Sequence, residues 1–317
     1  MQDFSGKIAV ITGGGTGMGR ALARALVAEG CHVATCDVID ENLAETRRLC
    51  EAEAPQGVKI STFRCDVANE DDTVAFARSV AEAFDTEHIN LLFNNAGIGG
   101  GGSFVSATRE EWDRTFNICW NGVYYMSRAF LPMMLASSEG HIINTSSVNG
   151  FRASLGGNIP HTSYSAAKFA VKGFTEALIN DFRFNAPHLK ASVVMPGYVG
   201  TQIAKNTGKI LGHKTPLDMT DEEIEAMRSR WVLSNAPEDA TPDQIRQQWQ
   251  ASQDNYEKGG LTSEQAADII LNGVRNEEWR ILVGPDAVAL DKAVRANPID
   301  AYDLDFSEKV WASMQDE

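Results

Sequence analysis

The chain has 317 residues, of which 43 % are hydrophobic and 22 % charged, a composition typical of a globular protein with a sizeable core. Its 28 basic and 43 acidic residues give a formal charge of −15 without any Lys/Arg cluster, so we expect no binding to nucleic acid or to a membrane surface. Five cysteines without a C-x-x-C pair predict reduced thiols and no metal site. The N-terminus lacks a targeting pattern and no apolar run reaches ~18 residues, so we expect a cytoplasmic protein.

Short β-branched runs alternate with amphipathic stretches along most of the chain. The runs predict strands at residues 7–12, 32–37, 59–66, 89–95, 141–147, 189–196 and 280–285. Stretches such as 20–30 and 71–84 between them predict helices. This order predicts an α/β fold, a doubly wound seven-stranded parallel sheet of the Rossmann type, in a single catalytic domain over residues 1–317.

The region from about 201 to 260 breaks this rhythm. It is rich in Gln, Asp, Glu and Asn and has helix-start signals at 220–227 and 241–249. Because ligands of open α/β sheets bind beyond the carboxyl ends of the strands, we interpret 202–260 as a helical lid insertion that shapes the substrate site. A peripheral helical decoration is the alternative, and residues 296–317 are expected to form a C-terminal tail.

The first predicted strand runs into the glycine-rich turn TGGGTGMGR at 12–20, which a helix follows. Gly13, Gly17 and Gly19 would let backbone N–H groups and a helix N-terminus approach a pyrophosphate. A tight strand-to-helix turn without a ligand is the alternative interpretation of the same glycines. Asp37 ends the second strand, where a carboxylate can bind the ribose hydroxyls of adenosine and repel a 2′-phosphate. The turn has no Arg or Lys before Gly17, so we expect NAD rather than NADP as the cofactor.

Tyr164 and Lys168 stand four residues apart in HTSYSAAKFA, with Ser165 and two alanines between them. On a helix this spacing places the phenol and the ammonium on one face, an arrangement suited to proton transfer. An ordinary amphipathic helix produces the same spacing by chance.

Together these residues resemble the short-chain dehydrogenase/reductase family over roughly residues 5–201. Further motifs occur in the family's order: a Cys65-Asp66-Val67 strand end, NNAG at 94–97, a serine at 147 and MPGYVGT at 195–201. The resemblance implies that the cofactor is bound by Gly13, Gly15, Thr16, Gly17, Met18, Asp37, Asp66, Val67, Asn95, Ala96, Gly97, Tyr164, Lys168, Pro196, Gly197, Val199 and Thr201.

The resemblance also implies a catalytic set of Ser147, Tyr164 and Lys168 that transfers a hydride between NAD(H) and a secondary alcohol or ketone. Tyr164 would be the general acid/base, with a pKa lowered by the neighbouring charge of Lys168, which in the family also holds the nicotinamide ribose. Ser147 would bind the reacting oxygen; Ser146 fits the family's S-x-x-G pattern less well. Small-molecule substrates and a homodimer or homotetramer are implied as well.

Two positions depart from the family pattern. Cys119 stands where the family often has an asparagine of the proton relay, and helix geometry prevents the flanking Asn117 and Asn121 from simply replacing it. If the family uses the backbone carbonyl there, Cys119 preserves that role; otherwise the proton leaves by another path. The interval from the serine to the tyrosine is also longer than usual, and it carries His161, interpreted as a substrate contact, an auxiliary base or a solvated side chain.

The apolar side chains beyond position 197 favour a hydrophobic or aromatic substrate if they line its pocket, but they would look the same if they only packed the insertion. They are Tyr198, Ile203, Ile210, Leu211, Met219, Met227 and Trp231. Two other functions remain open. One is an NAD(P)-binding regulatory protein without turnover, which would not need the catalytic set; the other is an NADP-linked reductase of acyl or keto-ester substrates, which Asp37 disfavours.

Overall fold

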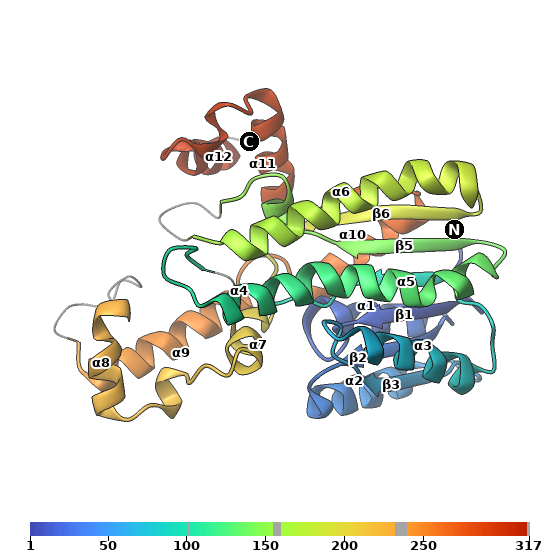
Figure 1. The fold of residues 1–317 in the computed structure, drawn as a ribbon, viewed down its shortest axis with the longest axis horizontal. Coiled ribbons are helices and arrows are strands. Elements are labelled where there is room, and N and C mark those ends of the chain that lie inside the picture. The colour runs from blue at the N-terminus through green and yellow to red at the C-terminus, as the bar shows by residue number, and fades with distance from the viewer. Residues whose placement is uncertain (101, 155–159, 232–239, 316–317) are drawn as a thin grey trace.

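One parallel sheet of seven strands forms the centre of the molecule, in the order β3-β2-β1-β4-β5-β6-β7 (Figure 1). The computed structural model describes residues 1–100, 102–154, 160–231 and 240–315, with the side chains of 227–231 and 315 excepted. The strands are β1 (Ile8–Thr12), β2 (His32–Asp37), β3 (Ile60–Arg64), β4 (Leu91–Asn94), β5 (Gly140–Thr145), β6 (Leu189–Pro196) and β7 (Arg280–Val283). The predicted α/β fold and all seven strands are therefore confirmed, with ends that differ by up to two residues.

Helices cover both faces of the sheet, and the alternation of side chains along each strand supplies a separate core to each face. In β1, Ile8 and Val10 pack on one side, whereas Ala9 and Ile11 pack on the other. The first side carries α3 (Glu70–Phe84), α4 (Arg109–Phe116), α5 (Gly122–Leu135) and α6 (Thr162–Asn185). The second carries α1 (Gly17–Ala28), α2 (Asp40–Glu53) and α10 (Ser263–Arg275).

The strand order reverses between β1 and β4. The chain moves outward from β1 through β2 to β3, then returns to place β4 on the other side of β1. Connections at such a switch point lead away in opposite directions, which opens a crevice above the carboxyl ends of the two strands. The predicted glycine turn follows β1 and the NNAG motif follows β4, so both border this crevice.

The NNAG motif also ties the central strands to the helices. The Asn94 amide donates to Ser127 Oγ on α5 at 3.0 Å and to Asn144 Oδ1 on β5 at 2.8 Å. Asn144 in turn donates to Thr175 Oγ1 on α6 at 2.9 Å. A buried polar network of this kind fixes the relative position of the elements that it joins.

Further helices extend the molecule beyond the carboxyl edge of the sheet (Figure 1). They are α7 (Ile203–Ile210), α8 (Asp221–Trp231) and α9 (Pro242–Lys258), followed after β7 by α11 (Pro285–Ala296) and α12 (Phe306–Gln315). The helices predicted from 220 and 241 are confirmed, and Thr241 and Gln244 form a capping box on α9. The segment expected as a tail contains α12, which packs through Phe306 and Val310 next to Val148 and Phe151.

The described residues were compared with two expectations, that the chain has no membrane-spanning helix and no metal site. Within those ranges, no helix is long and apolar enough to cross a membrane. No group of three or more His, Cys, Asp or Glu side chains there is placed to hold a metal ion. All five cysteines are buried and free.

Candidate active site

The glycine turn after β1 brings the backbone of α1 unusually close to the strand ends. Gly13 has φ +67°, and a Cβ there would lie 2.8 Å from the Cα of Ala96. A Cβ on Gly19 would lie 2.2 Å from the Gly13 carbonyl oxygen, closer than real atoms approach. The turn therefore needs glycine at both positions, one for the left-handed conformation and one for space.

The N-terminus of α1 is left open toward the crevice. Thr16 is the N-cap residue in extended conformation, yet its side chain makes no capping hydrogen bond, and no acidic residue stands in the first turn. The first N–H groups of a helix have no partner within the helix, and they carry a partial positive charge. With Gly17 and Met18 lining the adjacent cavity, this end of α1 is suited to an anionic group.

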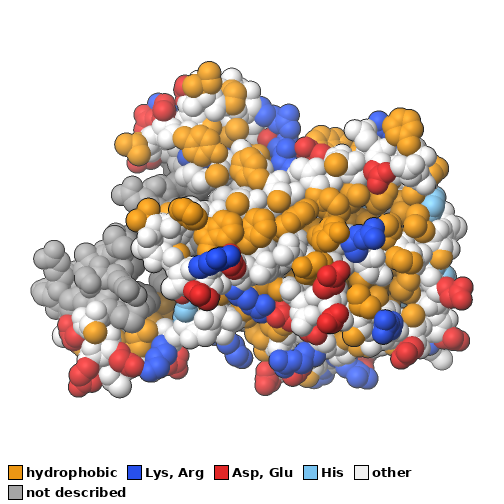
Figure 2. Space-filling model, viewed as in Figure 1, with side chains coloured by type: hydrophobic (Ala, Val, Ile, Leu, Met, Phe, Trp, Pro, Cys, Tyr) orange, Lys and Arg blue, Asp and Glu red, His pale blue; other side chains and the backbone are white. Residues whose placement is uncertain are grey.

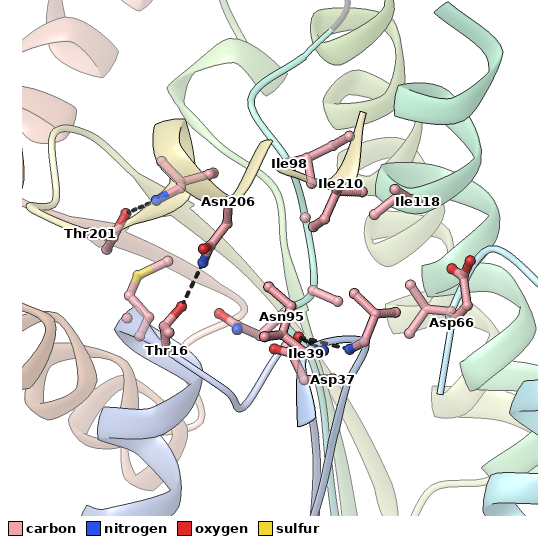
Figure 3. Close-up of a pocket in the computed structure, with 18 of the residues that line it drawn as sticks. Thr16, Asp37, Ile39, Asp66, Asn95, Ile98, Ile118, Thr201, Asn206 and Ile210 are labelled. Atoms are coloured by element: carbon pink, nitrogen blue, oxygen red, sulfur yellow. Dashed lines mark hydrogen bonds between the residues drawn. The ribbon is translucent and has the colours of Figure 1, made fainter. Parts of the chain in front are cut away.

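Asp37 closes the other side of the glycine turn. Its carboxylate accepts hydrogen bonds from the backbone N–H groups of Gly15 at 3.0 Å, Val38 at 2.7 Å and Ile39 at 3.2 Å. A Cβ on Gly15 would lie 2.7 Å from Asp37 Oδ2, so the turn and the carboxylate are fitted to each other. Asp37 also lines the cavity, where Figure 3 shows it below Asn95.

A single cavity runs along the carboxyl edge of the sheet between these groups (Figure 3). Most of the residues predicted to bind the cofactor line it: Gly13, Thr16, Gly17, Met18, Asp37, Asp66, Val67, Asn95, Ala96, Gly97 and Thr201. Residues that the sequence analysis did not single out for the cofactor also line it: Val38, Ile39, Cys65, Ile98, Arg114, Ile118, Ile203, Asn206 and Ile210.

Six predicted cofactor residues are not among those that line this cavity: Gly15, Pro196, Gly197 and Val199, and also Tyr164 and Lys168, which are described below. Gly15 supports the turn through Asp37, as described above. Pro196 ends β6, and a Cβ on Gly197 would lie 2.2 Å from an Asp286 carboxylate oxygen, so that carboxylate packs directly on the glycine. Val199 is buried and pairs with the chain just before α10.

Ser147, Tyr164 and Lys168 come together at the end of β5. The Ser147 side chain is near enough to the Tyr164 phenol to act on its pKa. Lys168 is 3 % exposed, and its ammonium donates to the carbonyl oxygen of Thr145 at 2.8 Å. The Ser146 hydroxyl points elsewhere and donates to the Lys168 carbonyl oxygen at 2.7 Å. Of the two serines, only Ser147 therefore has a hydroxyl at the phenol.

Burial dominates the titration of this group. It raises the pKa of Tyr164, while the hydrogen bond with Ser147 acts in the opposite direction. Burial likewise lowers the pKa of Lys168. The expected lowering of the Tyr164 pKa by Lys168 is not found in the protein alone: burial raises this pKa, and Ser147 supplies the opposing contribution. The phenol is therefore protonated at neutral pH.

The His161 side chain packs edge-on against the Tyr164 ring, with 5.3 Å between ring centroids. Burial lowers the pKa of His161, so its imidazole is neutral at neutral pH. Its Nδ1 atom is buried without a partner in the described part of the chain. The solvated side chain that the sequence left open is thus not observed. Residues 155–159, in the same loop, lie outside the described ranges.

Gly97 lies between the cavity and the group of Ser147, Tyr164 and Lys168. This glycine lines the cavity, and a Cβ on it would lie 3.5 Å from Lys168 Nζ. Asn95 Oδ1, on the same segment, is a buried acceptor with no partner among the described residues. An unused acceptor, a glycine cradle and an uncapped helix end are features that a dinucleotide would satisfy.

The position of the unexpected cysteine is a π-turn, Asn117–Asn121, between α4 and α5. Cys119 is buried, and its thiol contacts the carbonyl oxygen of Ile98 at 3.4 Å. Its Sγ would lie 3.8 Å from a Cβ on Gly97, beside the Lys168 ammonium. Asn121 donates to Asn117 Oδ1 at 2.9 Å, so the two flanking asparagines bind each other.

The expected apolar pocket is divided by α7. Ile203 and Ile210 line the cavity along the glycine turn, whereas Met219 lines a second cavity between α7, α8 and α9. Tyr198 packs on Tyr256, and Leu211 packs on the core of the sheet. The other two predicted side chains, Met227 and Trp231, lie outside those that the structure describes.

The family model described as short chain dehydrogenase matches residues 7–211. The chain belongs to the short-chain dehydrogenase/reductase family. A Mycobacterium tuberculosis protein named as an oxidoreductase, SadH, is 34 % identical over 93 % of this chain and 92 % of its own length. Levodione reductase of Leifsonia aquatica is 32 % identical over 74 % of this chain and 85 % of its own.

Solved structures of the family share the fold over most or part of this chain. A short-chain dehydrogenase/reductase from Burkholderia phymatum in complex with NAD has a TM-score of 0.73 and 28 % identity, over 94 % of this chain and 96 % of that one. A metagenomic family member in complex with NADP has a TM-score of 0.54 and 32 % identity, over 61 % of this chain and 83 % of that one. This chain is thus an oxidoreductase of a family that binds NAD(P).

Asn206 and Arg114 are the polar cavity residues of this family member that sequence reasoning missed. Asn206 shares a face of α7 with Ile203 and Ile210, a spacing of three and four residues that the sequence does display. Arg114 reaches the cavity from α4 and pairs with Asp66 at 2.7 Å. Nothing in the sequence indicates that pair, because its members come from separate elements.

Proposed function

We propose that the protein is an NAD-dependent dehydrogenase that interconverts a secondary alcohol and a ketone, with Tyr164 as the general acid/base. The observation that carries the proposal is the position of Gly97, which lines the cavity along the glycine turn and lies beside Lys168, in the group of Ser147, Tyr164 and Lys168. A reaction centre at the nicotinamide end of a dinucleotide site has to lie beside the cavity in this way.

The catalytic roles follow from the donors at the reacting oxygen. A bound nicotinamide dinucleotide supplies or accepts the hydride. In the reducing direction, the protonated Tyr164 phenol donates its proton to the substrate oxygen, and the Ser147 hydroxyl stabilises the charge that develops there. In the oxidising direction Tyr164 first has to lose its own proton, and the resulting phenolate then accepts the hydroxyl proton of the alcohol.

Lys168 has the geometry to support both steps. An ammonium has three N–H donors, and one of them is used by the Thr145 carbonyl. Two remain for a ribose hydroxyl and for the proton path away from Tyr164. Its charge lies 5.4 Å from the centre of the Tyr164 ring, where it favours the phenolate when the proton leaves.

Asp37 supports NAD rather than NADP. Its carboxylate lines the cavity and would face the 2′-position of the adenosine ribose, where a phosphate would be repelled. Arg20 lies nearby, but its Nε is bound to Thr46 Oγ1 and its Nη2 to the Gly15 and Asn42 carbonyls. Because that guanidinium is held within the turn, it offers little compensation for a phosphate.

The cavity supports an apolar substrate. Ile98, Ile118 and Ile210 gather on one side of it, while the charged and polar groups lie on the other sides (Figure 3). We propose a hydrophobic or aromatic secondary alcohol or ketone, with its oxygen at Ser147 and its apolar part against these isoleucines.

The cofactor preference is tested by fluorescence titration with NADH and, separately, NADPH. We expect NADH to bind at micromolar concentration and NADPH much more weakly. Asp37→Ser should reduce the difference in Kd between NADH and NADPH. Asp40→Ser, which removes an exposed carboxylate paired with Arg64, should leave that difference unchanged. Tighter binding of NADPH by the wild-type protein would instead favour the NADP-linked reductase.

Turnover is tested with Tyr164→Phe on a panel of hydrophobic secondary alcohols and ketones. This change keeps the ring against His161 and removes only the hydroxyl, so NADH binding should persist while the rate falls by about 10²–10⁴. Tyr125→Phe on α5 is the matched control. The regulatory alternative predicts a different result. In that case the wild-type protein binds NADH without turning over any substrate, and the Tyr164→Phe variant has the same biological output as the wild type.

We propose a homodimer or homotetramer that pairs through α5 and α6. Apolar side chains gather over these two helices in Figure 2, and the exposed ones include Tyr124, Leu135, Phe169 and Phe184. Exposed apolar patches of this kind mark protein interfaces. Light scattering coupled to size-exclusion chromatography tests this: a monomeric mass at all concentrations would contradict it.

A further inference from the structure

Helix α7 closes over the cavity through one hydrogen bond on each side. The Asn206 amide donates to Thr16 Oγ1 at 3.0 Å, directly above the glycine turn (Figure 3). On the other side, Thr207 Oγ1 accepts a hydrogen bond from the Gly99 N–H at 2.8 Å. No residue of α7 is buried, so these two bonds and the contacts of Ile203 and Ile210 hold the helix in place.

The Thr16 hydroxyl accepts the hydrogen bond from Asn206 and does not cap α1. Threonine is a favoured N-cap residue because its oxygen accepts a bond from the second or third N–H of the helix. Thr16 occupies the N-cap position of α1 with the extended backbone that capping requires, φ −150° and ψ 178°, but makes no such bond. Its oxygen is engaged by Asn206 instead.

We propose that Asn206 is a positioning residue for the dinucleotide: it holds the Thr16 hydroxyl away from α1 and so keeps the first N–H groups of the helix free for the pyrophosphate. This inference rests on the proposed dinucleotide function. Without the amide, Thr16 is free to rotate and cap its own helix, and an incoming phosphate then competes with that cap. Asn206 therefore acts on the cofactor through Thr16.

Isothermal titration calorimetry of Asn206→Ala with two ligands tests the inference. ADP-ribose carries the pyrophosphate, and adenosine does not. We expect the Kd of ADP-ribose to rise about 5- to 30-fold, the effect of an N-cap that has to be displaced. The Kd of adenosine should change less than about twofold, because adenosine does not reach the N-terminus of α1. An equal loss for both ligands would mean that the cavity has simply loosened, and would overturn the inference.

Two further variants test the route through Thr16. Lys205 lies on the same helix but lines the second cavity, so the Lys205→Ala variant should bind both ligands as the wild type does. In a Thr16→Ala background, where no hydroxyl is left to cap α1, Asn206→Ala should change ADP-ribose binding less than about twofold. A loss there as large as in the wild-type background would overturn the inference.

The proposed function fails differently. A folded wild-type protein that binds neither ADP-ribose, NADH nor NADPH would refute the dinucleotide site itself. Wild-type binding combined with unchanged binding by Asn206→Ala refutes only the role given to Asn206.

Discussion

His141, near the start of β5, is a buried, neutral imidazole, which makes the stability of the fold depend on pH. The residue is 1 % exposed, and its Nε2 lies 2.7 Å from Ser192 Oγ. Because that hydroxyl donates its own proton to the Glu278 carbonyl at 2.6 Å, it accepts from a protonated Nε2. Nδ1 is buried without a partner in the described part of the chain.

Burial lowers the pKa of His141 to about 3, against an ordinary value of about 6.5 in the unfolded chain. Below pH 6.5 the imidazole therefore binds a proton in the unfolded state but not in the folded state. The free energy of unfolding consequently falls as the pH falls toward 3. Above pH 6.5 both states are neutral and His141 has no effect. Between pH 7 and pH 5 the linkage amounts to about 2 kcal/mol of unfolding free energy, for any folded pKa below about 4.

Urea unfolding at pH 7 and pH 5, at one protein concentration, measures this difference. His141→Gln removes the titrating ring and retains an amide donor near Ser192, so this variant should lose about 2 kcal/mol less than the wild type over the same interval. His88→Asn, which removes an exposed imidazole, should follow the wild type. Equal losses in the wild type and His141→Gln would refute the neutral buried imidazole.

Other substitutions test the turn, the central network and the C-terminal helix. Gly19→Ala puts a Cβ 2.2 Å from the Gly13 carbonyl oxygen, so we expect a stability loss of about 1–3 kcal/mol in thermal unfolding and loss of NADH binding; unchanged binding would contradict the close approach. Asn94→Ala strips partners from its buried network and should cost about 1–3 kcal/mol in urea unfolding, a smaller cost implying that water replaces the amide. Arg152→Met removes the bond at 2.7 Å to the Ala301 carbonyl and should speed proteolysis after residue 297 while NADH binding persists; equal cleavage rates would show that this bond does not hold the segment.

The sheet and the nucleotide turn could be predicted because their causes are local. Strands of a sheet covered on both faces need apolar, β-branched residues at consecutive positions, and the burial of all five residues of β1 reflects that need. Gly13 and Gly19 are required by contacts within the turn and with the neighbouring strand end. Residues that are required by such local or steric contacts can be predicted from a single sequence.

The contacts that complete the site could not be predicted, because their partners lie far apart in the chain. Asn206 and Thr16 are 190 positions apart, and Arg152 and Ala301 are 149 apart. No local rule indicates such pairs. The segment expected as a tail is held next to Val148 and Phe151 by the Arg152 contact and by the packing of Phe306, neither of which composition or spacing displays.

The end of β5 shows how one short segment organises the proposed catalytic pair. Three consecutive residues each hold a different part of it: Thr145 binds the Lys168 ammonium through its carbonyl, Ser146 binds the Lys168 backbone, and Ser147 reaches the Tyr164 phenol. Because the first two contacts fix Lys168 at its backbone and at its charge, the helix that carries Tyr164 cannot rotate without breaking one of them. The alignment of the tyrosine and the lysine therefore depends on these contacts with the strand end as well as on their own helical spacing.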